Sequence, residues 1–75
     1  MKITLKIIGY LINNTGFSEK ELNIPQSITA EELLSMLKIK KNLPVLVIRN
    51  GRGIRLNEKI EDGDRIVISP FFSGG

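Results

Sequence analysis

The chain has 75 residues, which leaves room for one domain, because compact domains usually contain about 50 to 200 residues. It carries 11 Lys and Arg against 8 Asp and Glu, and this charge of +3 is scattered rather than gathered into the basic face that nucleic-acid binding needs. The absence of Cys and His excludes a thiolate nucleophile, a disulfide and a Cys/His zinc site, and so small a core has no room for an enclosed active site.

The N-terminal part of the chain has the pattern of two paired strands. Apolar and polar residues alternate through residues 2–9, which predicts a half-buried strand. Residues 10–14 form a short turn or a single helical turn, and turn-forming residues fill 13–16. An extended pattern resumes over residues 17–24 and ends at Pro25, which has no N–H to donate, so we expect this second strand to return beside the first.

A helix follows this second strand. Thr29 and Glu32 fit a capping box, in which the Thr29 hydroxyl accepts from the Glu32 amide and the Glu32 carboxylate accepts from the Thr29 amide. The helix therefore begins at Ala30. Its apolar residues recur at helical spacing and predict a stripe that packs on the sheet, made of Ala30, Leu33, Leu34 and Leu37.

The next segment predicts a hairpin. The β-branched run Val45–Ile48 favours a strand, and Asn50-Gly51 favours a type I′ turn, which requires positive φ at both central residues. Gly51-Arg52-Gly53 is only a fragment of a phosphate loop, because no third glycine and no Lys-Ser/Thr pair follow it, so the turn is the better interpretation. Four arginines across the last two strands could form a basic strip, which either meets an acidic partner or only guards the sheet edge: Arg49, Arg52, Arg55 and Arg65.

The last strand lies near the C-terminus. Residues 56–60 have no decisive pattern, Asp62-Gly63-Asp64 is a turn, and residues 66–68 are a strand that Pro70 ends. The expected order is ββαβ(β)β, an α+β fold. The acidic residues near this turn lack the spacing of a calcium loop and favour turn chemistry over a metal site: Glu58, Glu61, Asp62 and Asp64.

The C-terminal segment is the best candidate for function. We expect residues 1–70 to form the domain and 71–75 a flexible tail, because termini that are not tied down are usually mobile. Gly74-Gly75 lacks side chains, so it can pass through a narrow channel and place the terminal carboxylate inside a partner. A carboxylate is a poor electrophile until an enzyme converts one oxygen into a leaving group such as AMP. The chemistry then belongs to the partner; the alternative is a frayed end without a role.

The whole chain resembles a known family. The start KITLKIIGYLINNTG, the short capped Leu-rich helix, VIRNG, EDGDRIVISP and the terminal SGG are similar to the MoaD/ThiS family of ubiquitin-like β-grasp sulfur carriers. Within it the chain is more similar to MoaD, the small subunit of molybdopterin synthase, through its long first hairpin and its ending. It departs from MoaD proteins before the two glycines, where Pro70-Phe71-Phe72-Ser73 replaces their usual Pro-Pro-small-residue run.

The resemblance implies a mixed β-grasp sheet with one helix across it and with the first and last strands as parallel central neighbours. It implies that a MoeB/ThiF-type activating enzyme uses ATP to adenylate Gly75, that a sulfur donor converts this group to a thiocarboxylate, and that a MoaE-type large subunit holds the pterin that accepts the sulfur. Gly74 and Ser73 would thread the tail. The chain itself would be a carrier rather than an enzyme, with no bound cofactor and no metal.

Other features leave alternatives open. Adjacent aromatics on an extended segment point to opposite sides, so a small core can bury one of Phe71 and Phe72 and leaves the other exposed. We expect both residues to belong to a partner-binding segment with Phe72 as the anchor in a partner pocket; alternatively both pack on the domain. Rival functions are a ubiquitin-like modifier joined to target lysines, a thiamine-pathway carrier of the ThiS type, and a binding module. No bilayer-length apolar run or signal-peptide pattern occurs, so we expect a cytoplasmic protein that binds no membrane.

Overall fold

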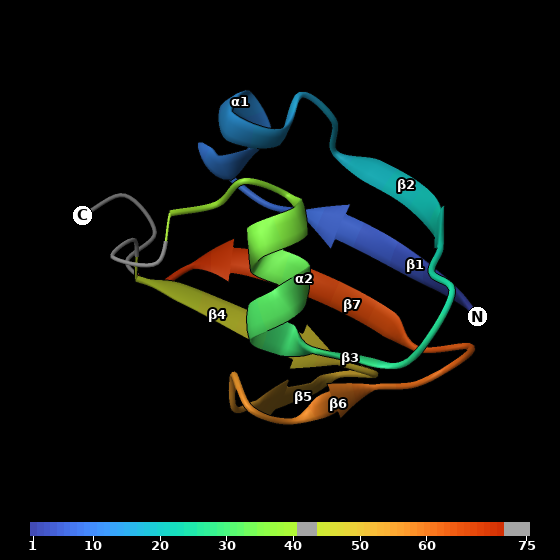
Figure 1. Cartoon of the computed structure of the whole chain (residues 1–75). Helices are drawn as coiled ribbons and strands as arrows, with labels where there is room; N and C mark the ends of the chain where they lie inside the picture. The colour runs from blue at the N-terminus through green and yellow to red at the C-terminus, as the bar shows by residue number, and fades with distance from the viewer. Residues whose placement is uncertain (41–43, 72–75) are drawn as a thin grey trace.

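A mixed sheet with one helix across it makes up the protein. The computed structural model describes residues 1–40 and 44–71. Five strands lie in the order β2-β1-β7-β4-β5, and α2 crosses one face of this sheet (Figure 1). The fold is therefore the α+β, ubiquitin-like arrangement expected from the sequence. In chain order the elements are β1 (Lys2–Ile7), α1 (Leu11–Thr15), β2 (Glu19–Asn23), β3 (Ile28–Thr29), α2 (Ala30–Met36), β4 (Val45–Arg49), β5 (Arg52–Ile54), β6 (Lys59–Ile60) and β7 (Arg65–Pro70).

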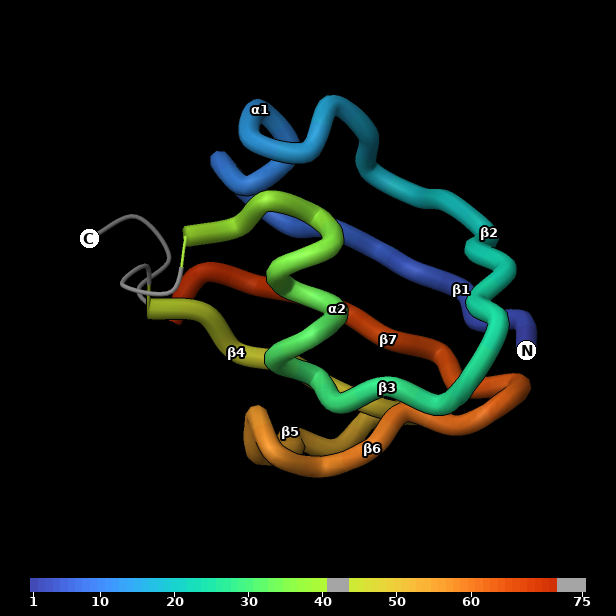
Figure 2. Tube along the Cα trace, in the orientation of Figure 1, coloured from blue at the N-terminus to red at the C-terminus, as the bar shows by residue number. Residues whose placement is uncertain are grey.

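The first and last strands are parallel neighbours at the centre of the sheet. Leu5 pairs with Ile66 and Ile7 with Ile68, while β2 and β4 flank this pair in antiparallel orientation. Parallel strands need a long crossover connection, and the intervening chain, which includes α2, provides it. Figure 2 shows β1 and β7 running side by side behind α2. This arrangement confirms the expected parallel pair.

Alternation along the central strands builds the core. In β1 the odd-numbered residues Ile3, Leu5 and Ile7 are buried and the lysines and threonine between them are exposed. In β7 the side chains of Ile66 and Ile68 are buried in the same way. Because successive side chains of a strand point to opposite faces, these residues meet α2 on one side of the sheet. The opposite side of the sheet is left without a covering element in the described residues.

Both ends of the capping box on α2 are formed. The Glu32 amide donates to Thr29 Oγ1 at 3.1 Å, and the Thr29 amide donates to Glu32 Oε1 at 2.8 Å. The helix begins at Ala30, as the sequence predicted. Of the expected stripe, Ala30, Leu33 and Leu34 are buried and Leu37 is half-buried against the core.

The hairpin between β4 and β5 has the expected turn. Asn50 has φ 51° and Gly51 has φ 84°, so both central residues have the positive φ of a type I′ turn. Three cross-strand pairs join β4 and β5 next to this turn. The first is Arg49 with Arg52, and the last is Val47 with Ile54. The interpretation of Gly51 as a turn residue is confirmed.

The element order is richer than expected. Residues 11–15 form a helix, α1, so the helical alternative for this segment is correct. The segment 56–60, which had no decisive pattern, contains β6, and β6 pairs with β3 immediately before α2. The expected ββαβ(β)β order left residues 56–60 open as an uncertain fourth strand, but it lacked β3 and the small second sheet, because two-residue strands are too short to show a period of two.

Candidate functional site

The last strand fixes where the C-terminal segment leaves the domain. β7 is held on both sides, and Pro70 pairs with Val45 at its end. The ladder continues one residue further, since the Phe71 amide donates to the Pro44 carbonyl at 2.9 Å. Phe71 is therefore tied to the sheet. Of the predicted site residues, Phe72, Ser73, Gly74 and Gly75 lie outside the described residues.

The base of this segment also packs on the loop after β1. The Pro70 side chain is buried, and a Cβ built on Gly9 would lie 3.3 Å from Pro70 Cγ. Gly9 itself has φ 69°, a conformation that residues with a Cβ rarely adopt. The Ile8 amide donates to the Ile68 carbonyl at 3.0 Å and brings this loop against β7. Gly9 and Pro70 thus form a close contact at the point where the chain leaves the sheet.

Phe71 is exposed, so it is not the buried member of the pair that the expected alternation of Phe71 and Phe72 called for. Its exposed fraction is 59%, larger than that of Leu46 or Ile8. Pro70 is the buried residue at this end of β7, which leaves no core position for the next side chain. Exposure of Phe71 is compatible with contact to another protein, and the partner-binding role of Phe71 and Phe72 stays a prediction.

An apolar patch lies on the side of the sheet opposite α2. Ile8 and Leu46 are 40% and 39% exposed, and Ile48 and Val67 between them are half-buried. The register brings them together, because Ile48 pairs with Val67, and Leu46 pairs with Ser69 next to it. We call the set Ile8, Leu46, Ile48 and Val67 the open-face patch. It adjoins the end of β7 from which the C-terminal segment departs.

Basic residues border the open-face patch. Lys6 pairs with Val67 across β1 and β7, and Arg65 lies two residues before Val67 on the same side of β7. Both side chains are exposed. The surface is thus apolar near the C-terminal end of β7 and basic near its start, so a complementary partner has an apolar centre and an acidic rim.

Sequence reasoning missed this patch, although the sequence holds a signal for it. A strand with one buried face alternates apolar and polar residues, whereas Val45–Ile48 and Ile66–Ile68 are apolar throughout. Such runs are normally buried on both faces. Here α2 covers one face only, so on the other face Leu46 is exposed and Ile48 and Val67 are only half-buried.

The expected basic strip does not exist as one surface. Arg49 and Arg52 form a cross-strand pair on the side of α2, whereas Arg65 lies on the opposite side. Arg49 is also engaged within the domain: its guanidinium lies 3.8 Å from Asp64 Oδ2 and 3.8 Å from Glu58 Oε1. The alternation of β4 and β7 therefore separates arginines that looked like one strip in the sequence.

Asp64 holds the turn before β7. It is 8% exposed and accepts hydrogen bonds from the Glu61 amide at 2.8 Å and from Asn50 Nδ2 at 3.2 Å. Asn50 Oδ1 accepts in turn from the Arg65 amide at 2.9 Å. These contacts join the two turns at one end of the sheet and confirm the turn role of Asp64.

In residues 1–40 and 44–71, no three acidic, His or Cys side chains are grouped so that they could hold a metal ion. Within the same ranges, no helix has the length and apolar character needed to cross a membrane.

Comparison with known proteins places the fold and the family. The model of the ThiS family matches residues 5–75. Subunit 1 in the complex of subunits 1 and 2 of molybdopterin-converting factor from Helicobacter pylori is 22% identical, with a TM-score of 0.64 and all of both chains covered. The thiamine biosynthesis protein ThiS from Geobacter metallireducens is 25% identical, with a TM-score of 0.61 over 96% of this chain and 99% of that one.

A further solved structure extends the similarity to protein modifiers. The small archaeal modifier protein 1 from Methanosarcina acetivorans is 21% identical, with a TM-score of 0.70 over 99% of this chain and 96% of that one. None of the curated proteins matches the sequence. The structural neighbours therefore share one ubiquitin-like fold but carry names from several different processes.

Proposed function

Because the chain belongs to the ThiS family, we propose that it is a sulfur carrier whose C-terminal Gly75 is activated by a partner enzyme. The observation that carries the proposal is the family match through residue 75, which includes the terminal Gly74-Gly75. The ubiquitin-like domain supports it, since β7 leads directly into this segment from the centre of the sheet. The chain then acts as a carrier and leaves catalysis to its partners.

The proposed chemistry begins at the terminal carboxylate. One of its oxygens attacks the α-phosphorus of ATP on a MoeB/ThiF-type activating enzyme, and pyrophosphate leaves. The terminal sulfur of a donor persulfide then attacks the acyl carbon and displaces AMP. A partner thiol cleaves the resulting acyl disulfide, which forms a disulfide on the donor side and leaves a thiocarboxylate on Gly75. We propose that the reaction takes place in the cytoplasm, where ATP is supplied.

We infer that the sulfur goes to a pterin bound by a MoaE-type large subunit, in molybdopterin or tungsten-pterin biosynthesis. Two observations support this choice: the resemblance of the sequence to MoaD, and the similarity in fold to subunit 1 of the Helicobacter pylori converting factor, which was solved in complex with its subunit 2. Transfer of the sulfur regenerates the carboxylate with an oxygen from water. A thiamine-pathway role of the ThiS type is the variant that the name of the matching family favours.

The open-face patch supports the need for partners. Ile8 and Leu46 are exposed apolar side chains on a sheet face that no described element covers, and Phe71 extends the exposed apolar surface toward the C-terminus. Exposed apolar clusters usually mark interaction sites. We propose that the activating enzyme and the large subunit use this surface in turn, so that each holds the domain while Gly75 occupies its active site.

A second candidate is a ubiquitin-like modifier, and the similarity in fold to small archaeal modifier protein 1 favours it. Both functions begin with adenylation, so they differ only in the product. An acyl thiocarboxylate indicates the carrier, whereas Gly75 found in isopeptide linkage to lysine in protein digests indicates the modifier.

The activation step is tested by pyrophosphate exchange. The purified activating enzyme should exchange labelled pyrophosphate into ATP in the presence of the full chain. A version with one residue added after Gly75 should lose the exchange, because its carboxylate is displaced from the reacting position. A version with one residue added before Met1 is the matched control and should retain it. Equal exchange by both extended versions contradicts the proposed function.

A further inference from the structure

Within residues 1–40 and 44–71, β2 is an edge strand whose outer backbone groups pair with no other strand. It pairs with β1 on one side only. The Ile7 amide donates to Ser18 and the Ile24 amide to Met1, so the even-numbered residues of β2 point their backbone groups at β1. In an antiparallel ladder the alternate residues then point outward. The N–H and C=O groups of Glu19, Glu21 and Asn23 therefore line the outer edge.

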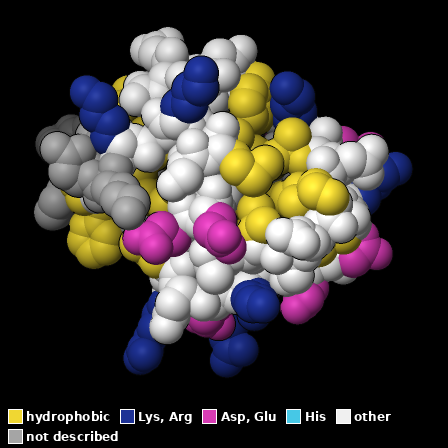
Figure 3. All heavy atoms as spheres, in the orientation of Figure 1, with side chains coloured by type: hydrophobic (Ala, Val, Ile, Leu, Met, Phe, Trp, Pro, Cys, Tyr) yellow, Lys and Arg dark blue, Asp and Glu magenta, His cyan; other side chains and the backbone are white. Residues whose placement is uncertain are grey.

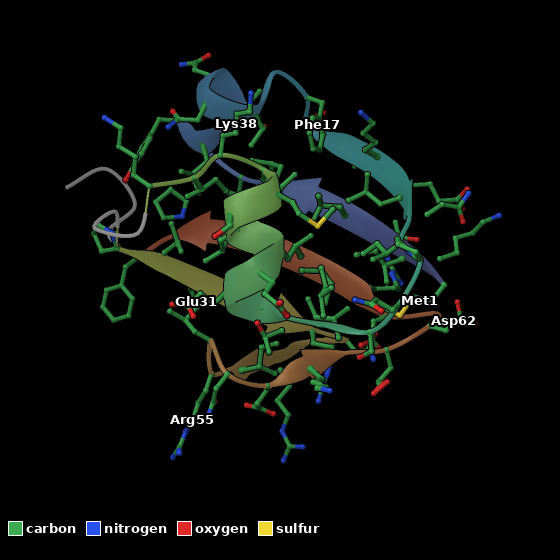
Figure 4. All side chains as sticks on the ribbon, in the orientation of Figure 1. Met1, Phe17, Glu31, Lys38, Arg55 and Asp62 are labelled. Carbon is green, nitrogen blue, oxygen red and sulfur yellow. The ribbon has the colours of Figure 1, made fainter. Side chains whose placement is uncertain are left out.

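Apolar side chains lie beside this edge on the side of α2. Leu22 pairs with the buried Ile3 and is half-buried on that side. Met36 is 54% exposed and follows Glu31 by five residues, a rotation of about 140° around the helix. Figure 4 shows Glu31 on the flank of α2 toward β4, so Met36 lies on the flank toward β2. Hydrophobic side chains gather between α2 and β2 in Figure 3.

The charges around this surface differ between its two sides. On the side of α2, Lys20 lies opposite Leu5, and its Nζ is 5.2 Å from the centre of the Phe17 ring. On the opposite side of β2, Glu19 and Glu21 face outward, and Glu21 is 3.7 Å from Lys2. A strand added to this edge thus meets a basic, apolar side and an acidic side.

A second copy of the chain fits this edge poorly. Full antiparallel pairing of two β2 strands places Glu21 opposite Glu21, and like charges directly opposite each other are destabilising. The charges instead select a different partner. We propose that the outer edge of β2 binds an extended segment of another protein, which adds as an antiparallel strand. Its side chains on the side of α2 are apolar and acidic, opposite Leu22 and Lys20, and its outward side chains are basic, opposite Glu19 and Glu21.

Backbone hydrogen bonds supply the affinity of such strand addition, and the alternating side chains supply its specificity. The surface is separate from the open-face patch, since β2 lies beyond β1 in the sheet and its apolar residues face α2. A partner on β2 therefore leaves Phe71 and the open-face patch accessible. The inference goes beyond the proposed function and does not depend on activation of Gly75.

The test uses a peptide of sequence TIKEKL and the isotope-labelled full chain. In antiparallel pairing its Ile lies opposite Leu22, its Glu opposite Lys20, and its two Lys opposite Glu21 and Glu19. We expect amide shifts in the NMR spectrum at residues 19–23 and at Met36, with a Kd of about 1 mM. The charge-reversed peptide TIEKEL should bind about tenfold more weakly, because three opposite-charge pairs become like-charge pairs.

Two variants separate this site from other surfaces. Lys20→Glu should weaken binding of TIKEKL, whereas Arg52→Glu on β5, the other edge of the sheet, should leave it unchanged. Both side chains are exposed, so the fold is retained. Shifts centred on Ile8 and Leu46, equal binding of the two peptides, or no shifts overturn the proposal. So does a concentration-dependent dimer of the chain that Leu22→Glu abolishes. Neither ATP nor the C-terminus takes part in this test. A negative result therefore overturns strand addition at β2 and leaves the proposed function unaffected.

Discussion

The contact between Gly9 and Pro70 is predicted to restrict the base of the C-terminal segment. Gly9→Ala introduces a Cβ at φ 69°, a left-handed conformation that costs about 1–2 kcal/mol. The same Cβ lies 3.3 Å from Pro70 Cγ, so the buried proline must shift. Overpacking of this kind adds about 1 kcal/mol or more. We therefore expect a loss of about 2–4 kcal/mol, a large part of the stability of so small a domain.

Gly63→Ala is the matched control. Gly63 has φ 86°, and a Cβ built on it meets nothing within 4 Å, so this variant carries the backbone cost without the contact. Urea unfolding, with the midpoint and slope measured for both variants, gives the two losses in free energy. Gly9→Ala should lose about 1 kcal/mol or more beyond Gly63→Ala. Equal losses show that the Pro70 contact is not restrictive and refute this description of the segment's base.

Two further predictions concern the helix and the open-face patch. Thr29→Ala removes the hydrogen bond that the Glu32 amide donates to the Thr29 hydroxyl, and it should lower the free energy of unfolding by about 1 kcal/mol. Thermal unfolding should show a fall in Tm of about 4–8 °C, and an unchanged Tm contradicts the capping role. Leu46→Glu should weaken binding to the activating enzyme about tenfold in calorimetric titration, because it places a charge in an apolar interface. Met36→Glu, at an exposed apolar position on the other face, should leave that affinity unchanged, and equal losses exclude the open-face patch as the contact.

The first strand, the start of α2 and the turn after β4 could be predicted from short patterns in the sequence. The alternation in residues 2–9, the Thr29–Glu32 capping box and the Asn50-Gly51 turn are all set by residues close together in the sequence. The structure confirms the capping box and the turn, and it confirms the first strand with its end at Ile7 instead of residue 9. β3 and β6 are about thirty positions apart in the sequence, and each strand is only two residues long. Neither segment can therefore show the two-residue alternation of a strand. Only the folded chain brings Ile28 beside Ile60.

The surfaces for partners were harder to predict than the fold. The exposure of Leu46 depends on the absence of a second layer over the described sheet, which the apolar runs alone do not reveal. The exposure of Phe71 follows from Pro70, whose ring takes the last core position of β7. The arginines of the expected strip were separated by strand alternation, which assigns Arg49 and Arg65 to opposite faces. The roles of Phe72, Ser73, Gly74 and Gly75 stay predictions.

The chemical state of Gly75 after activation tests the proposed function most directly. The full chain, incubated with ATP, its activating enzyme and a persulfide donor under reducing conditions, can be weighed intact by mass spectrometry. The carrier role predicts that sulfur replaces one oxygen, that this change maps to the C-terminal peptide, and that it disappears when ATP is left out. An unchanged mass of the chain, with the enzyme active on its ATP substrate, contradicts it.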